Sequence, residues 1–371
     1  MNSSNLESLN FFLNKNGGKD AVSNSLNCFE ACVCNILKNK YIDERDMLAA
    51  LFLREINTTL WVNDTTGVFR IYNLNDNIIP PWRRFVKVDQ FVKRQDDTSL
   101  QFLESLLDME QMVMIQTVFE KIKYYVWYDT ESDINNFDDG DYNHISLAVS
   151  HEDDKIYFAE KMPYNLNMSQ FVPCDSNKEI GVGYKSEFRE AFDYFLRCFT
   201  ISVDEVTLRD PAVHKKEIKE TLLKITEGYS ASTQNVNGYT RYYGAASLQK
   251  LTEFCENAVS LQNYYITPNW ELLGSVTFDL WMIKGARCIL KEYVKAKAEK
   301  IKKPERLDRL IELLTKSVMY WDNLSAMFVK VIKSDGMRLN EKIANFVRKI
   351  TSLENELNLE IRSVLQNDLL I

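Results

Sequence analysis

The second half of the chain repeats apolar residues every three to four positions from Asp210-Pro211 onward. This spacing puts apolar side chains along one stripe of an α-helix. Pro211 suits a first helical turn, where the N–H that proline lacks would have no partner. The pattern predicts an all-α helical bundle domain over 206–371. We expect its helices at residues 211–227, 245–263, 270–301, 305–333 and 339–366, with a polar loop at 228–244.

The first half mixes helical and strand patterns. Residues 44–55 and 186–199 read as helices, whereas 112–119 and 124–128 read as buried strands. That mixture predicts an α+β domain over 1–205. A length of 371 residues agrees with two domains.

Composition excludes several classes of function. The net charge of −8 argues against a nucleic-acid backbone binder. No apolar run reaches the ~18 residues needed to cross a membrane, no secretory signal opens the sequence, and no glycine-rich phosphate loop occurs. Seven cysteines at irregular spacing are typical of a reducing compartment, so we expect a cytoplasmic protein.

The histidines and cysteines do not form a metal-binding pattern. The chain has three histidines, His144, His151 and His214, and one cysteine cluster, Cys28-x3-Cys32-x-Cys34. No second cluster completes a familiar zinc spacing. We therefore expect no metal and no resident cofactor. The leading hypothesis is a catalytic site with a nucleophilic cysteine and a histidine distant from it in the sequence.

Cys28 is the candidate nucleophile. A polar segment, Asn24-Ser25-Leu26-Asn27, precedes it and a helix-forming run follows, so Cys28 is expected in the first turn of a helix. There the helix dipole favours the reactive thiolate. The alternative is a buried cysteine that packs as a small apolar residue, which we prefer for Cys32 and Cys34.

His144 is the candidate base. Residues 144–150 read as a strand, 151–154 as a turn with a solvated His151, and 155–160 as the returning strand. Such a hairpin would place His144 beside Glu160, which could orient the imidazole and stabilise its cation. The alternative is an ordinary polar pair at a sheet edge.

These residues together resemble a known family. A Cys-x-x-Ala-Cys segment at a helix start, with a later His-strand-turn-strand-acid segment, is similar to papain-like cysteine enzymes. The nearest resemblance is to the bacteriocin-leader (double-glycine) peptidases and their acyltransferase relatives of the butirosin type and the closthioamide amide-forming type. It implies a papain-like fold in the first domain, with Cys28 as nucleophile, His144 as base and Glu160 as orienting acid.

The chain departs from that family at two positions. Glu160-Lys161 stands where the peptidases have Asp-Pro, and Val22 stands where they have an oxyanion-hole Gln. The candidate oxyanion donors are therefore the backbone N–H of Cys28 and the side chains of Asn24, Ser25 and Asn27.

Two charge runs bear on substrates. Residues 129–154 carry many acids and no Lys or Arg, which would attract a small amine or diamine acceptor if they lie near His144. Residues 284–309 are rich in Lys and Arg, and such a stripe could dock an acyl or peptidyl carrier protein. Candidate carrier-binding residues are Lys291, Lys295 and Lys302. Both runs could equally be solvated surface.

The reaction expected from these features is amide formation through a Cys28 thioester. The acyl group would come from a phosphopantetheine thioester on a carrier protein, in natural-product biosynthesis, and would pass to an amine. Thioester exchange needs no ATP, which agrees with the missing phosphate loop. The alternatives are a cysteine peptidase or thioesterase with the same triad, and a non-catalytic scaffold.

Overall fold

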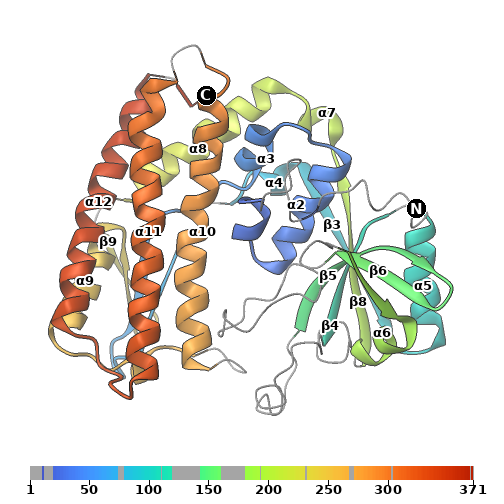
Figure 1. Cartoon of the computed structure of the whole chain (residues 1–371), viewed down its shortest axis with the longest axis horizontal. Coiled ribbons are helices and arrows are strands. Elements are labelled where there is room, and N and C mark those ends of the chain that lie inside the picture. Colours follow the sequence, from blue (N-terminus) through green and yellow to red (C-terminus); the bar gives the residue numbers. More distant parts are fainter. Residues whose placement is uncertain are drawn as a thin grey trace. The chain divides into compact units, whose positions relative to one another are not determined.

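The computed structural model describes residues 11, 20–73, 79–109, 111–118, 143–159, 180–192, 194–229, 232–266, 271–301, 304–367 and 369–370. The chain divides into two compact units (Figure 1). The first unit is Met1–Asp43 with Phe85–Glu205, and the second is Glu44–Arg84 with Val206–Ile371. The expected first domain, 1–205, therefore differs from the structure in residues 44–84, which belong to the second unit.

The first unit contains a six-stranded antiparallel sheet in the order β3-β8-β4-β5-β6-β7. Its strands are β3 (Val86–Arg94), β4 (Val113–Val118), β5 (Asn143–Glu152), β6 (Lys155–Ala159), β7 (Ile180–Tyr184) and β8 (Phe195–Val203). Its helices are η1 (Ser23–Ser25), α2 (Cys28–Lys40), α5 (Asp97–Asp108) and α6 (Lys185–Ala191).

Helices cover both faces of this sheet. Ile115 and Cys198 are cross-strand partners, and both belong to the core that includes Leu103 of α5 and Phe188 of α6. The neighbouring residue Phe199 points to the other face, where its ring meets Phe29 of α2 edge to face at 5.6 Å. The sheet is thus buried between α5 and α6 on one side and α2 on the other (Figure 1).

The second unit combines long helices with a four-stranded antiparallel sheet in the order β2-β1-β10-β9. The strands are β1 (Thr59–Asn63), β2 (Phe69–Tyr72), β9 (Ser232–Val236) and β10 (Tyr239–Tyr243). The helices are α3 (Arg45–Leu51), α8 (Pro211–Glu227), α9 (Ala245–Glu256), η5 (Leu261–Asn263), α10 (Leu272–Ala298), α11 (Glu305–Lys333) and α12 (Glu341–Gln366). Two short helices, α4 (Trp82–Phe85) and α7 (Glu205–Leu208), lie at the boundaries between the units.

One apolar core joins this sheet to the helices. Leu60 and Ile71 of the sheet share it with Leu251 of α9, Leu280 of α10 and Trp321 of α11. The prediction of an all-α second domain is therefore wrong in one respect. Half of the sheet comes from β1 and β2, which lie far before the helical segments in the sequence and carry no helical period, and the other half is the β9–β10 hairpin within 206–371.

A buried ion pair crosses the helical layer. Arg287 of α10 donates from Nε to Glu354 Oε1 of α12 at 2.9 Å, and both side chains are almost fully buried. The same oxygen accepts from Ser317 Oγ at 2.7 Å and Trp321 Nε1 at 2.9 Å, both on α11. Because a buried charge without partners is strongly unfavourable, this cluster fixes how the three helices align.

Several predicted elements match the structure closely. The helices expected over 211–227 and 305–333 have those bounds, and the strand expected over 112–119 is β4. The strand expected over 124–128 lies outside the described residues. The helix expected over 186–199 is wrong in its second half, because α6 ends at Ala191 and β8 begins at Phe195.

The polar loop expected over 228–244 is also wrong, because it contains the β9–β10 hairpin. Asn237 and Gly238 form its turn with φ of 50° and 79°. Positive φ at both central residues defines the tight hairpin turn that the sequence Asn-Gly favours. In the described part of the chain, no helix combines the length and the apolar character needed to cross a bilayer.

Gly244 offers a test of the junction between β10 and α9. Its φ is 52°, and a Cβ built there would lie 2.6 Å from the Tyr229 carbonyl oxygen. Gly244→Ala should lower the free energy of unfolding by more than the about 1–2 kcal/mol that the left-handed α conformation costs, because its ψ of −125° lies outside that region and the added Cβ meets a carbonyl oxygen. Chemical denaturation measures this.

Gly67→Ala is the matched control. Gly67 has φ of 69° but nothing within 4 Å of the added Cβ. The free energy of unfolding that Gly67→Ala loses therefore reports the backbone conformation alone. Equal losses in the two variants would contradict the steric account of Gly244.

Candidate active site at the start of helix α2

Helix α2 begins at Cys28, and Asn27 caps it. Asn27 Oδ1 accepts a hydrogen bond from the Glu30 backbone N–H at 2.8 Å, and Asn27 Nδ2 donates to Glu30 Oε2 at 2.8 Å. The first bond satisfies one of the backbone N–H groups that a helix start leaves without a partner, and the second holds the two side chains together. The predicted helix start is confirmed, and Cys28 occupies the first turn, where the dipole favours an anion.

The segment before Cys28 is held by Asp20. Asp20 Oδ1 accepts from the backbone N–H of Val22 at 2.9 Å and of Ser23 at 3.3 Å. Asp20 Oδ2 pairs with Lys38 Nζ, near the end of α2, at 2.8 Å. This anchor was not predicted, although an Asp followed closely by Ser is a common signal for a side-chain-stabilised turn.

A sulfur–carbonyl contact holds α2 to the beginning of β5. Cys32, one turn after Cys28, donates from Sγ to the Ile145 carbonyl at 3.7 Å. Ile145 directly follows His144, the second residue of β5, which is only 8% exposed. The structure therefore brings the segment that carries Cys28 to the segment that carries His144.

The strand register defines where the two side chains could meet. His144 lies opposite Thr117 on β4, and directly paired residues share a face of the sheet. That face also carries Ile115 and packs on α5 and α6, whereas α2 packs on the other. His144 and α2 thus lie on opposite faces of the sheet, so a contact between Cys28 and His144 would have to reach around the N-terminal end of β5, near the Cys32–Ile145 bond.

The third predicted member of the triad, Glu160, lies outside the described residues. The β5–β6 pairing is described as far as Leu147 opposite Ala159. His151 was expected in a turn, but it is a residue of β5, and its Nε2 lies 2.9 Å from Asp108 Oδ1. The turn consists of Asp153 and Asp154 alone.

Two of the three side chains expected as oxyanion donors, Asn24 and Asn27, have hydrogen-bond partners within the protein. The Asn27 side chain forms the helix cap, so its amide is already bound to Glu30. Asn24 Nδ2 donates to the Asp20 carbonyl at 2.8 Å, and Ser25 is 7% exposed at the end of η1. The backbone N–H of Cys28, in the first turn of α2, stays the expected backbone donor.

The acidic run is divided between the two ends of β5. Glu152, Asp153 and Asp154 are exposed beside the β5–β6 turn, whereas residues 129–142 lie outside the described residues. His144 is at the opposite end of the strand, roughly 27 Å from Glu152 at about 3.4 Å per residue. These three acids therefore do not act near His144, contrary to the expectation for the whole run.

The basic stripe over residues 284–309, which runs from α10 into α11, is mostly neutralised within the second unit. Lys295, 40% exposed, lies 3.8 Å from Glu292, Lys291 is partly buried, and Lys302 lies outside the described residues. Other cations of the stripe also face carboxylates: Lys284, Arg287, Lys297, Lys300 and Arg309. A carrier-docking role for this stripe loses its main argument, which was an excess of positive charge.

Two other cysteines have environments that suppress reactivity. Burial raises the pKa of the Cys198 and Cys255 thiols to about 12. They stay protonated at neutral pH, and the thiolate is the nucleophilic form. Cys28, in contrast, is partly exposed at a helix N-terminus.

Comparison with protein-family profiles and with curated protein sequences finds no match. Among the residues that the structure describes, no three His, Cys, Asp or Glu side chains gather closely enough to hold a metal ion. Cys28 at the start of α2 and His144 near the start of β5 are the two members of the predicted triad that lie among the described residues.

Selective alkylation tests the environment of Cys28. At pH 7.5, iodoacetamide should label Cys28 at least ten times faster than Cys198 or Cys255, because only thiolates react. Labelling of Cys198 and Cys255 should rise only as the pH approaches their raised values of about 12. Peptide mass spectrometry at several pH values gives the rates. Comparable rates for all three at pH 7.5 would mean that Cys28 is not activated.

Proposed function

We propose that this protein is a cysteine-dependent acyltransferase that forms an amide. Cys28 would carry the acyl group, and His144 would act as its base. One observation carries the proposal: the first turns of α2 are bonded to the start of β5 through Cys32 Sγ and the Ile145 carbonyl. Nucleophilic catalysis requires a thiol at a helix N-terminus within hydrogen-bond reach of a histidine, and the proposal places Cys28 and His144 together around the N-terminal end of β5.

In the first step, the Cys28 thiolate attacks the carbonyl carbon of an acyl thioester. The carbon–sulfur bond of the donor breaks, and the donor thiol leaves with the proton held by His144. The oxyanion that forms between these events would be stabilised by the Cys28 backbone N–H and the positive end of the α2 dipole.

In the second step, an amine attacks the Cys28 thioester. His144 takes the proton that the amine loses, the carbon–sulfur bond breaks, and Cys28 leaves as a thiolate. The products are an amide and the starting thiolate–imidazolium pair. Glu160 is the proposed orienting acid, a role that would hold the imidazole in one tautomer and stabilise its cation.

The proposed donor is an acyl or peptidyl carrier protein with a phosphopantetheine thioester, and the proposed acceptor is a small amine or diamine. This pairing needs no cofactor from the protein, because the thioester supplies the activation. Such a reaction belongs to natural-product biosynthesis in the cytoplasm. The papain-like identity of the first unit is part of the same proposal, supported by the helix-on-sheet packing of α2.

Mass spectrometry of the intact protein tests the covalent step. After exposure to acyl-carrier thioesters, the wild-type protein should gain one acyl mass, and Cys28→Ala should gain none. Cys34→Ala is the matched control, because Cys34 is a fully buried thiol of the same helix and should leave the adduct intact. An adduct that persists in Cys28→Ala would contradict the proposed nucleophile.

Addition of a diamine to the acylated protein then separates the possible reactions. Amide product supports acyl transfer, whereas release of free acid alone supports a thioesterase or peptidase with the same nucleophile. A Cys28→Ala protein that keeps its full biological output would instead support a non-catalytic scaffold.

A further inference from the structure

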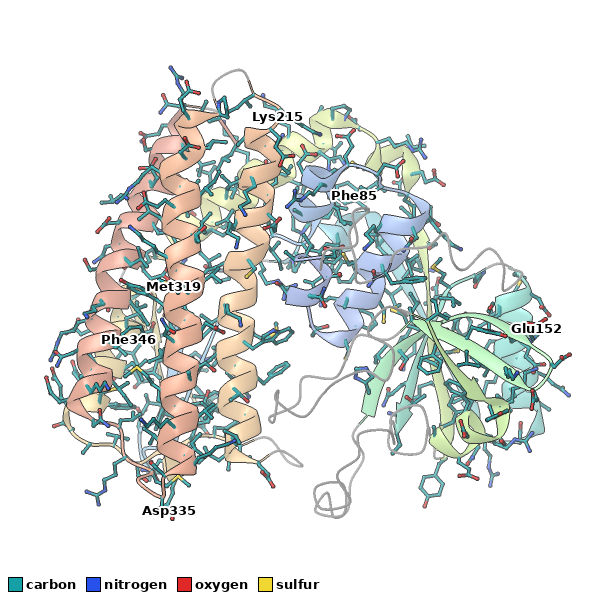
Figure 2. All side chains as sticks on the ribbon, in the orientation of Figure 1. Phe85, Glu152, Lys215, Met319, Asp335 and Phe346 are labelled. Atoms are coloured by element: carbon teal, nitrogen blue, oxygen red, sulfur yellow. The ribbon has the colours of Figure 1, made fainter. Side chains whose placement is uncertain are left out.

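A surface groove follows the seam between α11 and α12 in the second unit. Met327 of α11 and Phe346 of α12 line its floor, and Lys342, Asn345 and Lys349 complete its lining around about 580 Å³ of open space. Figure 2 marks Phe346 on α12, the helix that runs beside α11. The floor is apolar and its edge is cationic.

The floor is firmly supported. The Phe346 ring lies 5.5 Å from the Tyr320 ring of α11, and Met327 and Phe346 both pack against the apolar core of the second unit. Because these side chains rest on a buried core, the groove is a preformed feature and not a gap between mobile side chains. Preformed apolar surface lowers the entropy lost on binding.

The lysines of the groove differ from the cations of the basic stripe over residues 284–309. In the regions that the structure describes, Lys342 and Lys349 have no carboxylate within 4 Å. The neighbouring Arg348 is neutralised by Glu256 and Glu341. In a chain with a net charge of −8, two exposed ammonium groups beside an apolar floor form a local positive surface.

We propose that this groove docks an acidic amphipathic helix of a partner protein. Lys342 and Lys349 are seven residues apart, which is two turns of α12, or about 10 Å. A docked helix would therefore place carboxylates two turns apart against them and lay apolar side chains on Met327 and Phe346. Recognition by an apolar helix face with flanking charges is a recurring binding mode.

The chemistry favours a protein helix over a nucleic acid. A phosphate backbone would gain from the lysines but would leave the apolar floor unused, and base stacking needs open aromatic faces. The Phe346 ring already packs against Tyr320 and the core. The docking proposal does not depend on the proposed acyl transfer.

A charge-swap binding experiment tests the docking site. The probes are two fluorescent 16-residue helical peptides with leucine on one face, flanked by Glu in one peptide and by Lys in the other. The acidic peptide should bind the full-length wild-type protein. Lys342→Glu/Lys349→Glu should weaken its binding about tenfold or more and strengthen binding of the basic peptide.

Lys215→Glu is the control for position, because it makes the same kind of charge reversal at one exposed residue of α8 outside the groove (Figure 2). It should leave binding of both peptides within about twofold of wild type. Circular dichroism melting confirms that each variant is folded. Absence of binding to wild type, or equal weakening by Lys215→Glu and the double substitution, would overturn the proposal.

Discussion

The bond between the Cys32 thiol and the Ile145 carbonyl is the contact on which the candidate site depends. It joins the first turns of a helix to the first residues of a strand far away in the sequence. The Phe29–Phe199 ring contact holds the same helix to the sheet, and the Asp20–Lys38 pair fixes the segment that leads into it. Together these contacts position Cys28 through both long-range packing and the local turn that precedes α2.

The second unit depends on a different constraint. Arg287, Glu354 and Trp321 place a charged cluster inside three packed helices, and the cluster is satisfied only when those helices are aligned. Residues 85–205 of the first unit interrupt the second unit in the sequence. Two strands of the second unit's sheet, β1 and β2, come before this interruption, and the other two, β9 and β10, come after it. The chain must therefore fold the second unit from segments separated by more than a hundred residues, so its assembly needs long-range contacts.

Much of this organisation could be predicted from local signals. The proline at the start of α8 and the apolar stripe of α11 predicted the bounds of these two helices correctly. The polar residues before Cys28 predicted the capped start of α2. Two strand errors have a clear physical cause. β8 begins in an aromatic run that also suits a helix, and the polar β9–β10 hairpin lacks an apolar alternation, although Asn237-Gly238 signals its turn. The pairing of Asp20 with Lys38 and of α10 cations with carboxylates depends on tertiary packing, which spacing alone does not reveal.

NMR titration of His144 in the wild-type protein and in Cys28→Ala measures the central claim most directly. The chain has only three histidines, so the ring signals can be assigned by substitution. If Cys28 and His144 meet around the end of β5, the thiolate stabilises the imidazolium, and the pKa of His144 should fall when the thiol is removed. The same titration curve in both proteins would show that the two side chains do not interact.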